Sequence, residues 1–267
     1  MNFLENINRK DALRNGRSLI NVESHCSASL QKIKKMKNIL LIGGSYGIGL
    51  AIAKELQSEN NVFVASRTSE ELTNLNVTHI LFDASTDVLD VSKLPAIIDG
   101  LIYCPGSINL RPFKALKIEA FETDLQINFI GAVKVIQSVL PNLTASNQSS
   151  IVLFSSVAAS MGMPFHTSVA AAKGAVEGFA KALAAEYAPK IRVNVIAPSL
   201  TDTPLADKFL NNDEKKEKSS LRHPLKRFGT TDDIAQMANF LISDKSSWIS
   251  GQIFHVDGGM STLLVNG

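Results

Sequence analysis

The sequence predicts one doubly wound α/β domain, with a seven-stranded, mainly parallel sheet and helices on both faces. Short apolar runs alternate with longer segments of helical spacing from residue 37 to the carboxyl end. The runs are continuously apolar, as expected for strands that are buried on both faces of a parallel sheet. Strands that alternate with helices form right-handed crossovers, which place helices on both sides of the sheet.

Seven strands and three long helices are expected in order along this domain. The strands are predicted at residues 37–44, 61–66, 78–82, 99–104, 150–156, 191–198 and 251–259. The helices are predicted at residues 47–59, 118–140 and 166–186, where apolar residues recur at helical spacing. Residues 211–224, with the sequence NNDEKKEKSSLRHP, are polar and charged. Two interpretations remain open for them: a solvated loop, or a mobile lid over a substrate pocket.

The chain divides into an N-terminal extension, residues 1–36, and the predicted domain, residues 37–267. Of the 267 residues, 45% are hydrophobic and 19% are charged, which is typical of a globular protein. The extension carries a net charge of +4 and the domain carries −2, so the domain lacks the basic surface typical of nucleic-acid binding. We expect the extension to be poorly ordered and dispensable for the fold. An organelle transit segment is the alternative, and the acidic residues of the extension count against it.

Cysteine content and apolar run lengths predict a cytoplasmic protein that uses neither a metal nor a membrane. Cys26 and Cys104 are too few for a disulfide framework or a metal cluster. No apolar run is long enough to span a membrane, and the first 36 residues lack the apolar core of a secretory signal.

The segment LLIGGSYGIGLAIA predicts a dinucleotide-binding site of the Rossmann type. Glycines between a strand and a helix allow a tight turn, a close approach of the backbone to phosphate, and close helix packing. The N-terminus of the helix then offers free N–H groups to a diphosphate. A glycine turn without a ligand is the alternative, and the flanking strand and helix argue against it. The loop residues expected to contact the cofactor are Gly43, Ser45, Tyr46, Gly47, Ile48 and Gly49.

The end of the second strand predicts a preference for NADP(H) over NAD(H). An acidic residue there would bind both ribose hydroxyls and repel a 2′-phosphate, but this sequence has Ser66 and Arg67. Serine leaves room for the phosphate, and arginine supplies a charged fork that binds it. A surface arginine without a ligand is the alternative. Asp83, after the third strand, either binds the adenine amino group or turns the chain.

From about Lys37 to the carboxyl end, the motifs resemble the short-chain dehydrogenase/reductase family in its compact form. The GxxxGxG pattern of that family matches the three loop glycines, and its C-terminal pattern matches LKRFGTTDDIAQMANFLIS and WISGQIFHVDGG. The resemblance implies further cofactor contacts at Gly106, Lys173, Pro198 and Thr203. It assigns catalytic positions to Asn128, Ser156 and Lys173.

Three positions depart from the pattern of the family. The Asn-Asn-Ala-Gly that follows the fourth strand is Tyr103-Cys104-Pro105-Gly106 here, and the Pro-Gly that follows the sixth strand is Pro198-Ser199. The third departure concerns the catalytic tyrosine of the family, whose position holds Val169. Counting from Ser156 and counting from Lys173 lead to the same valine. By sequence position, none of the three tyrosines, Tyr46, Tyr103 and Tyr187, replaces the missing phenol.

The missing phenol leaves the proton of a carbonyl reduction without its usual donor. Histidine is the commonest general acid and base, and His166 lies three residues before Val169, so it is the first candidate. A structural or exposed histidine is the alternative. Ser156 would hold the substrate oxygen, or else it caps a loop at the end of its strand. Lys173 would bind the nicotinamide ribose whether or not catalysis occurs.

Two functions follow from these residues. The first is an atypical NADP(H)-dependent oxidoreductase that interconverts a small carbonyl compound and its alcohol without the usual tyrosine. The alternative is a non-catalytic dinucleotide-binding sensor or interaction protein, and nothing in the sequence favours a lyase or isomerase. The retained Thr203 and the lid favour the enzyme. The resemblance also implies a homotetramer or homodimer, and small residues at 170–178 would let helices approach closely.

Overall fold

The computed structural model describes residues 36–265. The predictions for the N-terminal extension concern residues outside this range, except for Met36, and they stay predictions. Continuously apolar segments form the seven strands of one sheet, which pair in the order β3-β2-β1-β4-β5-β6-β7. Every neighbouring pair is parallel. The strands are β1 (Lys37–Ile42), β2 (Asn60–Ser66), β3 (Val77–Leu81), β4 (Gly100–Tyr103), β5 (Ser149–Phe154), β6 (Ile191–Pro198) and β7 (Ile253–Val256).

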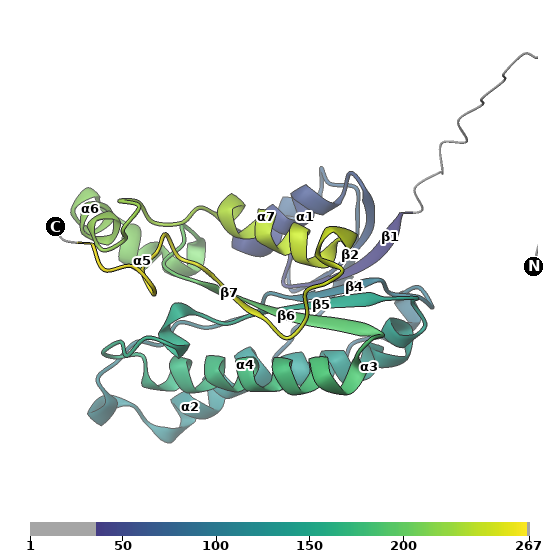
Figure 1. The fold of residues 1–267 in the computed structure, drawn as a ribbon, viewed down its shortest axis with the longest axis horizontal. Helices are drawn as coiled ribbons and strands as arrows, with labels where there is room; N and C mark the ends of the chain where they lie inside the picture. Colours follow the sequence, from purple (N-terminus) through teal and green to yellow (C-terminus); the bar gives the residue numbers. More distant parts are fainter. Residues whose placement is uncertain (1–35, 266–267) are drawn as a thin grey trace, which may run out of the picture. The chain divides into compact units, whose positions relative to one another are not determined.

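Helices cover both faces of this sheet, as predicted for a doubly wound fold. Figure 1 shows α1 and α7 side by side on one face and α2, α3 and α4 on the other. Each face has its own apolar core, one beneath each layer of helices. The helices are α1 (Gly47–Leu56), α2 (Ile118–Leu125), α3 (Gly131–Thr144), α4 (Thr167–Tyr187), α5 (Asp207–Leu210), α6 (Asp213–Leu221) and α7 (Thr231–Ile242).

The helix predicted over residues 118–140 is interrupted. A π-helical turn, Gln126–Ile130, separates α2 from α3. The turn contains Asn128, whose Nδ2 donates to the carbonyl oxygen of Asp124 at 2.8 Å. At Gly131, where α3 begins, a Cβ would lie 2.3 Å from the hydroxyl of Tyr103, so only glycine fits there. Periodicity does not reveal a single inserted residue, because the apolar pattern continues on both sides of it.

Several other predicted boundaries are wrong by a few residues. The helix predicted to reach residue 59 ends at Leu56. The last strand is shorter than residues 251–259, because Gly251, Gly258 and Gly259 have φ values of +73°, +62° and +84°. Those values belong to the left-handed region, which ends an extended strand. Residues 211–224, predicted as a loop or lid, contain α6.

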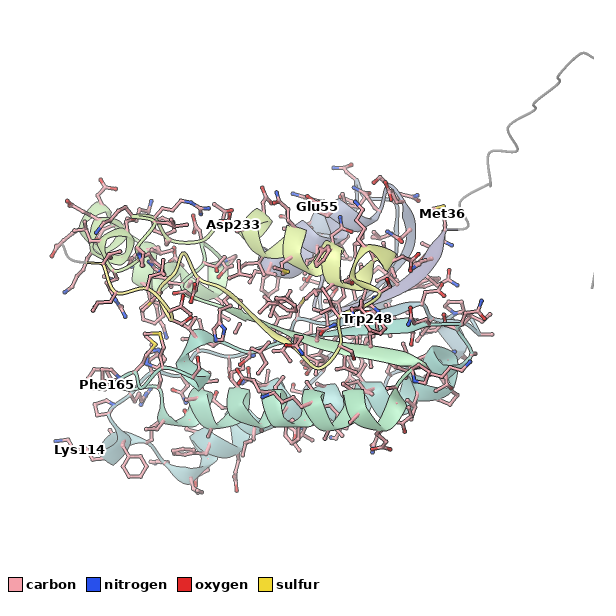
Figure 2. The ribbon with its side chains drawn as sticks, in the orientation of Figure 1. Met36, Glu55, Lys114, Phe165, Asp233 and Trp248 are labelled. Carbon is pink, nitrogen blue, oxygen red and sulfur yellow. The ribbon has the colours of Figure 1, made fainter. Side chains whose placement is uncertain are left out.

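The order of the strands places the crevice of the fold at their carboxyl ends. The chain runs outward in opposite directions from the neighbours β1 and β4, and ligands bind at such a switch point. The segment with α5 and α6 leaves the sheet at the carboxyl end of β6 (Figure 1). In Figure 2, Phe165 and Lys114 lie at this end of the domain, far from Met36 at the amino end of β1.

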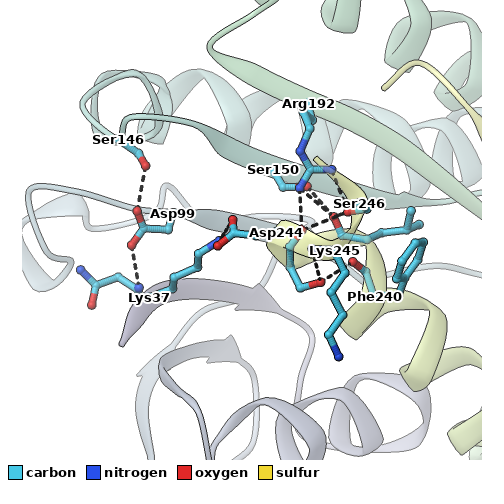
Figure 3. Close-up of polar contacts among 12 residues, drawn as sticks. Lys37, Asp99, Ser146, Ser150, Arg192, Phe240, Asp244, Lys245 and Ser246 are labelled. Carbon is cyan, nitrogen blue, oxygen red and sulfur yellow. Dashed lines mark hydrogen bonds and ion pairs between the residues drawn. The ribbon is translucent and has the colours of Figure 1, made fainter. Parts of the chain in front are cut away.

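The amino end of the sheet is closed by a structural cluster of polar contacts (Figure 3). Arg192 of β6 is 6% exposed, and its guanidinium donates to the Ser246 hydroxyl and to the carbonyl oxygens of Leu241, Ser243 and Ile249. Lys37 forms an ion pair with Asp244 in the same region. These bonds tie the C-terminal end of α7 to the sheet, and the carboxyl ends of the strands remain open for a ligand.

Candidate functional site

Two adjoining cavities lie at the carboxyl ends of the strands. The first, here called the glycine-loop cavity, has a volume of about 230 Å³. The second, here called the lysine cavity, has a volume of about 430 Å³ and includes Lys173 in its wall. The residues that line both cavities are here called the shared wall, and an extended ligand could lie along it. Six residues line both cavities: Ile48, Cys104, Gly106, Phe154, Thr203 and Leu205.

The glycine loop fits a dinucleotide diphosphate. Gly43 and Gly47 have φ values of +76° and +58°, which L side chains rarely adopt. A Cβ on Gly49 would lie 2.1 Å from the carbonyl oxygen of Gly43, so the turn closes only with glycine there. Helix α1 has no side-chain cap at Tyr46 and no acidic residue in its first turn. Its first N–H groups and its dipole are therefore available to an anion.

The predicted 2′-phosphate site lies at the end of β2. Arg67 lines the glycine-loop cavity, and its Nη2 donates to the Tyr46 hydroxyl at 3.0 Å. Ser66 is 4% exposed, and its hydroxyl donates to the carbonyl oxygen of Thr68 at 2.8 Å. The serine therefore organises the turn, and the guanidinium retains donors for a phosphate.

Asp83 turns the chain, as the second of its two interpretations stated. Its carboxylate accepts hydrogen bonds from the hydroxyl and the backbone N–H of Ser85, and the hydroxyl bond is the main reason that the pKa of Asp83 is lowered. Asp83 also lines the glycine-loop cavity, so the adenine contact stays a prediction.

Lys173, Asn128 and Gly106 come together beneath the shared wall. Lys173 is 7% exposed, and its Nζ donates to the carbonyl oxygen of Phe154 at 2.9 Å. Burial lowers the pKa of this amine from 10.5 to about 8. A Cβ on Gly106 would lie 3.2 Å from Oδ1 of Asn128 and 3.4 Å from Nζ of Lys173. Burial also raises the pKa of the Cys104 thiol, which therefore stays protonated beside them.

Val169 lines the lysine cavity, where an acid or base would be expected from the family. It is 5% exposed on the first turn of α4, one turn before Lys173. The described tyrosines do not replace it. Tyr46 stands at the glycine loop, the Tyr103 hydroxyl donates to the carbonyl oxygen of Ile127, and Tyr187 packs against the core at the far end of α4.

Ser156 and His166 line the same cavity as Val169. The Ser156 hydroxyl accepts a hydrogen bond from the backbone N–H of Ala158 at 3.2 Å, so the serine caps a short turn and still faces the cavity. Nδ1 of His166 lies 2.8 Å from the carbonyl oxygen of Pro164 and therefore carries a proton. Nε2 of His166 has no hydrogen-bond partner within residues 36–265 and is available to a ligand.

Pro198 and Thr203, which were predicted to contact the cofactor, both line the lysine cavity, and the contacts stay predictions. Pro198 ends β6 and lines the lysine cavity. Thr203 lines both cavities, and its hydroxyl accepts a hydrogen bond from the backbone N–H of Ala206, which starts a 3₁₀ turn.

A serine–histidine pair in this cavity was not predicted from the sequence. The Ser199 hydroxyl lies 2.8 Å from Nε2 of His223, and Nδ1 of His223 lies 2.8 Å from the carbonyl oxygen of Ser219. Since Nδ1 donates to that carbonyl, Nε2 accepts the Ser199 proton. His223 is 3% exposed, so this bond also holds the end of the α6 segment on β6. The only sequence signal for this pair was Ser199, which stands where the family has the glycine of its Pro-Gly pattern. That signal does not identify His223 as its partner.

A buried carboxylate beside Lys173 was also missed. Asp124 is 1% exposed, its Oδ1 accepts a 2.5 Å hydrogen bond from the Ser107 hydroxyl, and its Oδ2 has no hydrogen-bond partner within residues 36–265. The Ser107 hydroxyl in turn accepts from Nδ2 of Asn128 at 2.8 Å. The charge of Asp124 partly opposes the effect of burial on the pKa of Lys173. Spacing of four residues between Asp124 and Asn128 was the available signal.

Neither a membrane span nor a metal site is found in the described part of the chain. No helix there is long and apolar enough to cross a membrane. No group of three or more His, Cys, Asp or Glu side chains within residues 36–265 could hold a metal ion.

Known proteins share both this sequence and this architecture. The family described as enoyl-(acyl carrier protein) reductase matches residues 43–261. A 3-oxoacyl-[acyl-carrier-protein] reductase FabG of Staphylococcus aureus is 32% identical in an alignment of 246 residues that covers 85% of this chain and 99% of that protein. A 2-(S)-hydroxypropyl-CoM dehydrogenase 3 of Xanthobacter autotrophicus is 29% identical over 86% of this chain and 99% of its own.

Solved structures agree with these relatives. The ligand-free aldohexose dehydrogenase of Thermoplasma acidophilum superposes with a TM-score of 0.79 and 26% identity, over 88% of this chain and 97% of its own. The family match over residues 43–261 includes the glycine loop, the lining of the lysine cavity and the C-terminal strand. The chain therefore belongs to the short-chain dehydrogenase/reductase family.

Proposed function

We propose that this protein is an NADP(H)-dependent oxidoreductase that interconverts a small carbonyl compound and its alcohol without a tyrosine acid. One observation carries the proposal: the glycine-loop cavity shares six lining residues with the lysine cavity, which Ser156 and Lys173 line. A dinucleotide with its diphosphate on the glycine loop can then reach a substrate held beside Ser156. When bound, the cofactor supplies or accepts the hydride.

The cofactor preference rests on charge at the end of β2. Arg67 lines the cavity, and the acid that would favour NAD(H) is absent from this strand end. The Arg67 guanidinium donates a hydrogen bond to the Tyr46 hydroxyl, which already restricts the arginine side chain. Binding a phosphate would therefore cost less conformational entropy. Gly49 and the uncapped start of α1 would hold the diphosphate.

The residues of the lysine cavity divide the remaining work. The Ser156 hydroxyl would donate to the substrate oxygen and hold it in position. The buried Lys173 amine would donate to the nicotinamide ribose, whose site adjoins Gly106. Val169 cannot carry a proton, so the proposal assigns the transfer to the imidazolium form of His166, whose Nε2–H would donate its proton to the substrate oxygen and leave the neutral ring with its proton on Nδ1. The Pro164 carbonyl fixes the orientation of the imidazole. His166 is half-buried, so water can reach the ring and restore its proton after each turnover.

Hydride transfer can be tested directly with NADPH that is deuterated at the transferable position. The native protein is incubated with a panel of ketones and aldehydes, and the alcohols are analysed by mass spectrometry. The proposal expects one deuterium in the alcohol product, and less product in Ser156→Ala. Bound NADPH without a deuterated product from any carbonyl compound would contradict the proposal.

A non-catalytic dinucleotide-binding protein is the second candidate, and Val169 is the observation that favours it. A valine at this place leaves the residues that hold the cofactor and removes the usual acid. In that case NADPH binds normally and no carbonyl compound is reduced.

The proposal also includes a homodimer or homotetramer and a cytoplasmic location. Trp248 is 99% exposed just before β7, the strand at one edge of the sheet. In the proposed oligomer, a second copy of the chain covers this side chain.

A further inference from the structure

Positive charge surrounds the lysine cavity, although the predicted domain as a whole carries a net charge of −2. Besides the buried Lys173, four cationic side chains line the cavity, and all four are exposed: Lys208, Lys215, Lys218 and Arg222. No aspartate or glutamate lines it. A cavity lined by one sign of charge concentrates ligands of the opposite sign.

The positive and negative side chains of helix α6 lie on different faces of the helix. In a helix each residue advances by about 100°, so positions 215, 218, 219 and 222 lie on one side. These four positions line the cavity, and the buried Ser219 lies among the three cations. The three carboxylates of the same helix, Asp213, Glu214 and Glu217, lie outside the lining. This arrangement differs from that of a solvated helix whose opposite charges pair along one face.

These cations are not neutralised by the protein. None of the four forms an ion pair with a carboxylate within residues 36–265. The amine of Lys208 donates to the carbonyl oxygen of Ile108. The amine of Lys215 donates to the carbonyl oxygen of Lys208 and to the side-chain oxygen of Asn211, so neither amine is paired with a carboxylate. The side chains of Lys218 and Arg222 have no hydrogen-bond partner within the described range. They are free to bind anionic oxygens.

Beneath this charged mouth the cavity is apolar. Val169, Met163 and Leu200 line it, together with Phe154 at the shared wall. An ion without an apolar part would leave these surfaces in water, and an uncharged hydrophobic compound would leave the cations unused. An apolar compound with one anionic end matches both parts of the cavity.

We propose that the lysine cavity selects a carbonyl substrate with an apolar body and an anionic end, a carboxylate or a phosphate, which Lys218 and Arg222 of the α6 face bind. That the bound compound is a substrate rests on the proposed oxidoreductase function. Binding of the anion at Lys218 and Arg222 does not depend on turnover. The cofactor diphosphate is a less suitable anion for these cations, because none of them lines the glycine-loop cavity. Lys218 and Arg222 determine specificity and take no part in proton transfer.

The test is calorimetric binding to the protein, both alone and saturated with NADP⁺, since the oxidised cofactor cannot reduce a ketone. The probes are acetoacetate, levulinate and longer keto carboxylates, each compared with its methyl ester, and a keto-alkyl phosphate of matched length. The variants are Lys218→Glu and Arg222→Glu. The matched control is Lys216→Glu, which makes the same charge change on α6 outside the cavity.

The proposal expects at least one anion to bind about tenfold more tightly than its neutral counterpart. Each cavity-facing reversal should weaken that anion by roughly tenfold, while the control variant and the esters change by less than about twofold. The carboxylate and phosphate probes show which anionic end is preferred. NADPH affinity, measured on every variant, should not change.

Equal binding of anions and esters, or equal effects of the Lys218 and Lys216 reversals, would overturn the anionic site. Absence of binding by every anionic probe would overturn it as well. Anion binding that depends on Lys218, in a protein that reduces no carbonyl compound, would uphold the site and contradict the oxidoreductase proposal instead.

Discussion

The amine of Lys173 donates a 2.9 Å hydrogen bond to the carbonyl oxygen of Phe154, at the end of the strand next to its own helix. Burial lowers the pKa of this amine from 10.5 to about 8. Between about pH 8 and pH 10.5, the unfolded chain binds more protons at this position than the folded chain. The free energy of unfolding therefore increases as pH rises through this range. Below that range the fold bears the full cost of burying an ammonium group.

Lys173→Met should therefore change how stability depends on pH. As pH rises from about 8 to about 10.5, the native protein should gain up to about 3 kcal/mol of unfolding free energy relative to the variant. Urea denaturation of both proteins across this range measures the difference. Parallel pH profiles would show that Lys173 is not buried as a titrating group. NADPH binding should be weaker in the variant at every pH.

Arg67→Ala should reduce the preference for NADPH. A charge-assisted contact with the 2′-phosphate is worth about 1.5–3 kcal/mol, so NADPH affinity should fall by about ten- to a hundredfold while NADH affinity changes little. Fluorescence titration with both cofactors measures this. Arg111→Ala removes the same charge outside both cavities and is the control. Equal affinity of the native protein for the two cofactors would refute the preference.

Gly49→Ala should disrupt cofactor binding with little effect elsewhere. The new Cβ would lie 2.1 Å from the carbonyl oxygen of Gly43, so the loop must move away from the diphosphate position. We expect NADPH affinity to fall by at least about tenfold. Gly162→Ala, where a Cβ meets no atom within 4 Å, should leave affinity unchanged. A Gly49→Ala protein that binds NADPH as the native protein does would contradict the loop assignment.

Light scattering should give two or four times the chain mass of 28.8 kDa, as expected for a dimer or a tetramer. Trp248 is the only tryptophan of the chain, so its fluorescence reports on the surface where a second copy is expected. Dilution that dissociates the oligomer should shift its emission to longer wavelength, and Trp248→Asp should favour the monomer. A native mass near 28.8 kDa would refute the oligomer.

Much of the fold could be predicted because its signals are local. Continuous apolar runs indicated buried strands, and the glycines at 43, 47 and 49 required one turn geometry wherever the rest of the chain lay. The resemblance to the family, counted from Ser156 and from Lys173, assigned Val169 to the position of the catalytic tyrosine, and Val169 lines the lysine cavity.

The parts that were missed depend on contacts between distant segments. Ser199 meets His223 across 24 residues, and periodicity in either segment does not indicate that pairing. Asn128, in the π turn, donates a hydrogen bond to the Ser107 hydroxyl in another loop, and the apolar pattern of its own helix does not indicate that contact. Residues 211–224 were predicted as either a solvated loop or a mobile lid, and only their helical arrangement in the structure separates the cations that line the cavity from the carboxylates that do not.

Val169→Tyr should convert a slow carbonyl reductase into a faster one. The new phenol would lie on α4 one turn before Lys173, whose positive charge would lower its pKa. General acid catalysis is worth about 10²–10⁴ in rate, so ketone reduction should rise within that range if the cavity holds the larger side chain. NADPH affinity is measured on both proteins, so that a change in rate is not confused with a change in binding.

Single-turnover oxidation of NADPH by the native protein, with a panel of ketones, tests the central claim most directly. The account predicts measurable oxidation with at least one carbonyl compound, a lower rate in His166→Gln, and a higher rate in Val169→Tyr. Robust reduction that is unchanged in His166→Gln would show that the proton has another source, with the Ser199–His223 pair next in line. If NADPH binds normally and neither the native protein nor Val169→Tyr oxidises it, the protein is a dinucleotide-binding protein without redox activity, and the account is wrong.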